Sequence, residues 1–199
     1  MPKTMIDLIR HGEPTGGNRY RGHAIDDPLS ENGWSQMWNA VGSFNEWDRI
    51  VTSPLQRCKS FADALGDRYG IEVMVESRFK EVGFGAWEGL DHDAIKIDRE
   101  AEYSAFISDP VNQRPKDSEP LDDFIQRVSL AFSEIVERYR NERVLIVTHA
   151  GVIRTIIAIS LNIPPKNLYL IKVKNGGITQ IRYSRIGAVL EMLNGKLSN

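Results

Sequence analysis

The sequence has very little cysteine, no long apolar run and almost no net charge. Cys58 is the single cysteine among 199 residues, which excludes an intramolecular disulfide and fits a reducing compartment. No stretch approaches the roughly 20 apolar residues that span a bilayer, and the apolar run near the start is too short for a signal peptide. A net charge of -2 gives no basic excess. We therefore expect a cytoplasmic protein with no nucleic-acid or membrane partner.

Strand-like and helix-like patterns alternate along most of the chain. Short apolar runs predict strands at 5–9, 49–52, 72–75 and 143–148. Helical periodicity predicts helices after Ser30, after a Ser53–Gln56 capping box, and over 121–139 and 152–161. Three further strands are expected after Pro165. This alternation predicts an α/β fold, a three-layer α/β/α sandwich with a mostly parallel central sheet, in one domain spanning 1–199.

Two regions carry less pattern than the rest. Residues 91–118 are polar and hold several acids and two prolines, so we expect a small lid-like insertion that contributes to substrate specificity. Exposed strands after Leu168 could pair between subunits and form a homodimer.

Chemistry-bearing side chains gather at three predicted strand ends. Arg10 and His11 end the first strand, Arg57 follows the second, and His149 and Ala150 follow 143–148. Taken singly, such a histidine is more often a packed or surface residue than a catalytic one. Ligands of such sheets bind outside the carboxyl ends of the strands, so the convergence points to one site. A neutral imidazole can attack phosphorus, while arginines and the amide of Ala150 can hold phosphoryl oxygens.

These residues lie in segments that resemble the histidine phosphatase superfamily, the phosphoglycerate mutase-like enzymes. Segment 8–13 reads LIRHGE, and segments 28–33, 53–58, 81–89 and 147–154 follow in the family's order. The resemblance covers residues 5 to 160. Its overall length and the run FGAWEG at 84–89 are similar to the branch that contains alpha-ribazole-phosphate phosphatase.

The resemblance implies roles for individual residues. His11 would become phosphorylated while Arg10, Arg57 and His149 clamp the phosphoryl group. Glu81 would protonate the leaving oxygen and then activate water. Asn18, Arg21 and Gly22 fall near the family's remaining phosphate-loop positions, although Asn18 is displaced by one residue. Glu88 is expected to be structural, and no metal or cofactor is expected.

Three activities are compatible with this reading. The first is metal-independent hydrolysis of a small phosphomonoester, with alpha-ribazole 5'-phosphate as a named substrate and sugar phosphates or nucleotides as a broader alternative. The second is a phosphoglycerate mutase-type phosphomutase. A non-catalytic phospholigand-binding module is the third, but such modules commonly lack the nucleophile or an arginine, and this chain lacks neither.

Overall fold

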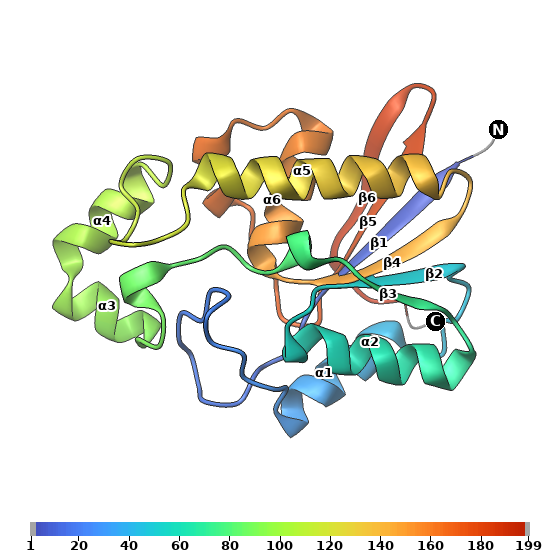
Figure 1. Cartoon of the computed structure of the whole chain (residues 1–199), viewed down its shortest axis with the longest axis horizontal. Coiled ribbons are helices and arrows are strands. Elements are labelled where there is room, and N and C mark those ends of the chain that lie inside the picture. The colour runs from blue at the N-terminus through green and yellow to red at the C-terminus, as the bar shows by residue number, and fades with distance from the viewer. Residues whose placement is uncertain (1–2, 198–199) are drawn as a thin grey trace.

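The computed structural model describes residues 3–197 and places a six-stranded sheet between two layers of helices (Figure 1). The strand order is β3-β2-β4-β1-β5-β6. Four strands are parallel: β1 (Thr4–Arg10), β2 (Arg49–Thr52), β3 (Val73–Val75) and β4 (Arg143–Thr148). The antiparallel strands β5 (Ile178–Ser184) and β6 (Gly187–Gly195) complete one edge.

Alternate residues of the central strands face the two helical layers. Ile6 and Leu8 belong to the apolar cluster that includes α5 (Leu121–Arg138) and α6 (Ala150–Leu161). Ile9 instead belongs to the cluster of α1 (Glu31–Val41) and α2 (Gln56–Tyr69). The sheet is therefore buried on both faces, as parallel sheets require. The predicted three-layer α/β/α architecture is confirmed.

The predicted helix starts are partly correct. Ser30 caps α1, because its side chain accepts a hydrogen bond from the amide of Gly33 at 3.0 Å. The predicted capping box of the next helix is wrong: α2 begins at Gln56, and Leu55 precedes it without a side-chain cap. The hydroxyl of Ser53 hydrogen-bonds Nε2 of His149 at 2.7 Å. The same hydroxyl also accepts the amide of Leu55 at 3.3 Å, so Ser53 serves the turn before α2 and His149 together.

Residues 91–118 contain regular structure that the sequence pattern does not reveal. They form α3 (His92–Asp98) and α4 (Glu100–Ser108), which Figure 1 shows beyond the carboxyl ends of the parallel strands. Asp91 caps α3 by accepting two backbone amides. The side chains of Ile95 and Phe106 are buried and attach the two helices to the larger apolar cluster. A lid function for this segment stays a prediction.

Short 3-10 helices complete the chain at η1 (Ser77–Phe79), η2 (Gly85–Trp87) and η3 (Pro165–Leu170). The expectation of three strands after Pro165 is wrong, because η3 and an irregular segment replace the first of them. That segment is anchored where the carbonyl of Val173 accepts a hydrogen bond from Arg10.

β6 lies at the sheet edge, and homodimer formation stays a prediction. No helix within residues 3–197 is long and apolar enough to cross a membrane.

Candidate active site

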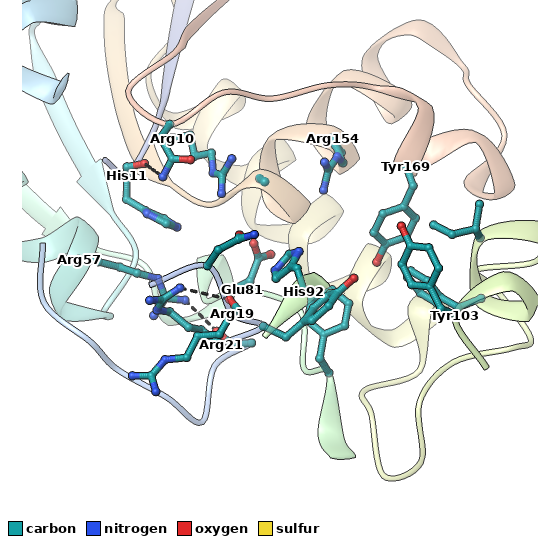
Figure 2. A pocket seen from close by; sticks show the side chains of 18 residues that line it. Arg10, His11, Arg19, Arg21, Arg57, Glu81, His92, Tyr103, Arg154 and Tyr169 are labelled. Atoms are coloured by element: carbon teal, nitrogen blue, oxygen red, sulfur yellow. Dashed lines mark hydrogen bonds between the residues drawn. The ribbon is translucent and has the colours of Figure 1, made fainter. Parts of the chain in front are cut away.

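A cavity of about 400 Å³ opens at the carboxyl ends of β1 and β4 (Figure 2). Parallel strand ends meet at one edge of the sheet, so residues far apart in sequence line the same space. Of the residues predicted from sequence, the cavity is lined by Arg10, His11, Asn18, Arg21, Gly22, Arg57, Glu81 and Ala150. His149 lies behind His11, with the two ring centroids 5.2 Å apart. The structure thus brings all nine predicted residues into one region.

His11 directly follows β1 and is held in one orientation. Its amide donates to the carbonyl of Thr148 at 2.9 Å, and its Nδ1 lies 2.8 Å from the carbonyl of Gly12. A carbonyl oxygen only accepts, so Nδ1 carries the hydrogen and Nε2 keeps its lone pair. Burial and then the charges of Arg57 and Arg10 hold the pKa of His11 well below its usual value. The imidazole is therefore neutral at neutral pH.

His149 is fully buried at the end of β4, immediately before α6. Its Nε2 hydrogen-bonds Ser53, and the sulfur of Cys58 lies 3.6 Å from the same nitrogen. Burial, followed by the charge of Arg57, holds the pKa of His149 well below its usual value. Cys58 is completely buried, and burial raises the pKa of its thiol. Cys58 is therefore a packing residue rather than a reactive thiol.

Arg10 and Arg57 supply positive charge beside His11. Arg10 donates from Nη1 to the carbonyl of Val173 at 2.8 Å, and burial together with the charge of Arg154 lowers its pKa to about 10. Arg57 is buried and donates to the carbonyls of Gly22 at 2.7 Å and Ile25 at 3.0 Å. Within the described part of the chain, Nε of each arginine is buried without a hydrogen-bond partner. An anion would compensate such unmet cationic groups.

Arg21 organises the loop that follows His11 rather than pointing freely at the cavity. Its Nη2 donates to the carbonyls of Thr15 at 2.6 Å and Gly17 at 2.8 Å, and its Nε binds Asp27 at 2.7 Å. Gly22 has a φ of +52°, and its carbonyl holds Arg57. Both residues therefore shape the loop over residues 12–27, and their direct contact with phosphate stays a prediction.

Asn18 lines the cavity from the same loop, and its carbonyl accepts the amide of His92 at 3.1 Å. That bond ties the loop to the start of α3. A contact between the Asn18 side chain and phosphate stays a prediction.

Glu81 is the single acidic side chain among the residues that line the cavity. Its Oε1 accepts the amide of Val82 at 2.9 Å and its Oε2 accepts the amide of Gly151 at 3.2 Å, which joins it to the first turn of α6. Arg127 holds the loop beneath it by donating to the carbonyls of Lys80 at 2.9 Å and Glu81 at 3.2 Å. The carboxylate therefore has a fixed position at the cavity wall.

Glu88 has the structural position expected for it. Its two oxygens accept the amides of Phe84 at 2.8 Å and Ala24 at 3.0 Å, which ties the loop after Glu81 to the loop over residues 12–27. Within residues 3–197, no three His, Cys, Asp or Glu side chains are grouped so that they could hold a metal ion.

Several further residues line the cavity. The sequence marks Tyr20 and Tyr103 as candidates for a substrate rim and favours a supporting role for Arg154. It singles out neither His92 nor Tyr169 as a site residue. Arg154 lies four residues after Ala150 on α6, a spacing that places both on one helix face, so helical periodicity could have found it. His92 stacks on Tyr20 with ring centroids 3.9 Å apart, and Tyr103 and Tyr169 form the opposite wall (Figure 2). These four side chains come from three distant segments, which no local pattern connects.

Comparison with known proteins places the chain in a family. Residues 6–196 match the histidine phosphatase superfamily (branch 1). The adenosylcobalamin/alpha-ribazole phosphatase of Escherichia coli is 29% identical over 95% of this chain and 95% of its own. An Erwinia tasmaniensis protein named "probable phosphoglycerate mutase" is 23% identical over 90% of this chain and 85% of its own.

A solved structure gives the same assignment. Mycobacterial glucosyl-3-phosphoglycerate phosphatase superposes with a TM-score of 0.85 at 26% identity, covering 98% of this chain and 100% of its own. The chain belongs to the histidine phosphatase superfamily and is a phosphatase of that type.

Proposed function

We propose that the chain hydrolyses small phosphomonoesters through a phosphohistidine intermediate at His11. One observation carries the proposal: Nδ1 of His11 donates to Gly12, which leaves Nε2 as a neutral, unprotonated nitrogen at the wall of an arginine-lined cavity. A nucleophile in that state does not have to lose a proton before it attacks phosphorus.

The proposed reaction has two displacements. In the first, Nε2 of His11 forms a bond to phosphorus while the ester oxygen leaves and takes a proton from Glu81. In the second, Glu81 accepts a proton from water, the resulting oxygen attacks phosphorus, and the bond to His11 breaks to release inorganic phosphate. Arg10 and Arg57 stabilise charge on the equatorial oxygens in both steps. The amide of Ala150, first in its helix and without an intrahelical acceptor, supports the same charge.

The physiological substrate is a separate question. The name of the Escherichia coli relative supplies alpha-ribazole 5'-phosphate as one candidate, and the name of the mycobacterial structure supplies a phosphorylated glucosylglycerate as another. Sugar phosphates and nucleotides form the broader alternative. A panel of these esters, ranked by kcat/KM, identifies the preferred substrate.

Trapping the intermediate tests the mechanism. Enzyme mixed with ³²P-labelled substrate and quenched in alkali should retain label on protein, and acid should release it. His11→Asn should abolish both the label and the release of phosphate, whereas His149→Asn should still become labelled, more slowly. Label on the His11→Asn protein, or phosphate release without labelled wild type at any quench time, would contradict the proposal.

Product analysis separates hydrolysis from phosphoryl transfer between positions of one substrate. With 3-phosphoglycerate as substrate, a phosphatase releases inorganic phosphate in step with substrate loss. Formation of 2-phosphoglycerate with little free phosphate would favour the mutase, an activity carried in the name of the Erwinia tasmaniensis relative.

A further inference from the structure

The cavity extends past the phosphate-binding residues into an outer compartment. We define this outer compartment by Arg154, Tyr20, His92, Tyr103 and Tyr169, all of which line the cavity. Figure 2 shows Arg154 beside Tyr169, away from His11 and Arg57 in that view. The guanidinium carbon of Arg154 lies 5.3 Å from the centre of the Tyr169 ring. A leaving group bound outward from the phosphoryl group would lie in this compartment.

Five arginines line the cavity, and three of them have a carboxylate nearby while two do not. Arg19 and Arg21 each form an ion pair with Asp27 at 2.7 Å, and Arg57 lies 4.0 Å from Asp26. Within residues 3–197, neither Arg10 nor Arg154 has a carboxylate partner inside that distance. The proposed chemistry compensates Arg10 with the transferred phosphoryl group. The proposed chemistry places no negative charge beside Arg154.

Arg154 is held in place and oriented by the fold. Its Nε donates to the carbonyl of Ile171 at 2.8 Å, and this bond leaves its two terminal nitrogens available. Figure 2 shows Arg154 on the far side of Arg10 from His11, and after burial its charge is the next cause that lowers the pKa of Arg10. Arg154 therefore belongs to the outer side of the phosphate-binding residues. Two neighbouring cations without an anion repel each other, which favours an arriving anion at each.

We propose that Arg154 binds a second anionic group, a carboxylate or a second phosphate, on the leaving group of the substrate. The terminal nitrogens of a guanidinium form two parallel hydrogen bonds to such a group, which fixes its distance from the phosphoryl group. The surrounding walls are uncharged, since burial raises the pKa of the Tyr20 and Tyr169 phenols and lowers that of the His92 imidazole. Among the described residues that line the cavity, Glu81 is the single acid.

This inference rests on the proposed hydrolysis and ranks its candidate substrates. Phosphomonoesters that carry a second anionic group are preferred to those whose leaving group has none. Alpha-ribazole 5'-phosphate belongs to the second, less preferred group. The competing explanation is that Arg154 is a third clamp on the transferred phosphoryl group itself. In that case every substrate would depend on Arg154 to the same degree.

A matched pair of substrates tests the inference. 3-Phosphoglycerate and glycerol 3-phosphate differ by a carboxylate in place of a hydroxymethyl group, and phosphate release gives kcat and KM for each. A charge-assisted pair predicts that wild type prefers the carboxylate by about tenfold or more in kcat/KM, with the difference mainly in KM. Fructose 1,6-bisphosphate compared with fructose 6-phosphate measures a second phosphate in the same way.

The variants are Arg154→Gln, which removes the charge, and Arg154→Lys, which keeps it without the planar fork. Arg154→Gln should reduce the preference ratio to near one, and Arg154→Lys should give an intermediate ratio. Arg140→Gln, an exposed arginine paired with Glu137 away from the cavity, is the matched control and should keep the wild-type ratio. Urea unfolding of each variant verifies folding.

Two results would overturn the inference: a wild-type ratio near one for both matched pairs, or equal losses for both members of each pair in Arg154→Gln. Turnover of p-nitrophenyl phosphate separates this failure from failure of the proposed function. If wild type hydrolyses that ester through labelled His11 but shows no preference, only the inference fails. Absence of hydrolysis with every ester rejects both.

Discussion

Mild acid should destabilise the protein because two buried histidines cannot take up protons in the folded state. His11 and His149 have pKa values well below their usual value, with burial as the largest cause for each. In the unfolded chain each takes up a proton near about pH 6.5. Below that pH the unfolded state binds more protons than the folded state, so the free energy of unfolding falls as pH falls. The stabilisation that the two neutral histidines give the folded state is fully present above about pH 6.5 and decreases as the pH falls below it.

The size of the effect follows from the number of protons. Between about pH 7 and about pH 5.5, each histidine that stays neutral in the folded state lowers the free energy of unfolding by about 1 kcal/mol. The pair therefore removes about 2 kcal/mol, and His92, whose pKa is also lowered, adds in the same direction. Carboxyl groups with lowered pKa values, such as Asp27 and Glu76, act only at lower pH.

Urea unfolding followed by tryptophan fluorescence measures this difference, in buffers free of phosphate because phosphate would bind the folded state. Replacing one histidine, in His11→Asn or His149→Asn, should remove about half of the pH-dependent loss while keeping the sign of the rest. A wild-type free energy of unfolding that is equal at the two pH values would refute the reasoning. So would a His149→Asn protein whose loss matches that of wild type.

Three substitutions test the support of individual site residues. In Gly151→Ala the added Cβ would overlap Oε1 of Glu81, so kcat for glycerol 3-phosphate should fall at least about tenfold while the urea midpoint shows a folded protein. Arg127→Met removes the hydrogen bonds to the loop that carries Glu81. The value of kcat should fall more for alkyl phosphates than for p-nitrophenyl phosphate, because the p-nitrophenolate leaving group needs no proton. Equal losses for both kinds of ester would count against a positioning role. Ser53→Ala removes the hydrogen bond to His149, and kcat/KM should fall about fivefold, with no change arguing that the bond is dispensable.

Much of the fold could be predicted because it depends on local patterns. The strand ends bearing His11 and His149 converge for a general reason: the carboxyl ends of neighbouring parallel strands lie at one edge. The long helix α5 could be predicted from its apolar periodicity over 18 residues. Its buried stripe packs on the same face of the sheet as α6.

The missed features depend on contacts between distant residues. Helices α3 and α4 are short, and each contributes one buried side chain, Ile95 or Phe106, to the large cluster. Tertiary packing rather than local periodicity holds them. The hydrogen bond between Ser53 and His149 has the same origin, since the two residues lie 96 positions apart in sequence. The proposed role of Arg154 depends on the ion pairs of the neighbouring arginines, which connect residues that no local pattern links.

The arginines at the site have two electrostatic effects that belong together. Burial first, and after it the charge of Arg57, holds the pKa values of His11 and His149 down, which keeps the proposed nucleophile unprotonated. An entering phosphoryl dianion offsets those positive charges and favours protonation of a nearby imidazole. In the proposed mechanism His11 is then bonded to phosphorus and no longer takes up a proton. We therefore expect an entering phosphate group to raise the pKa of His149, whose Nε2 hydrogen-bonds Ser53 at 2.7 Å.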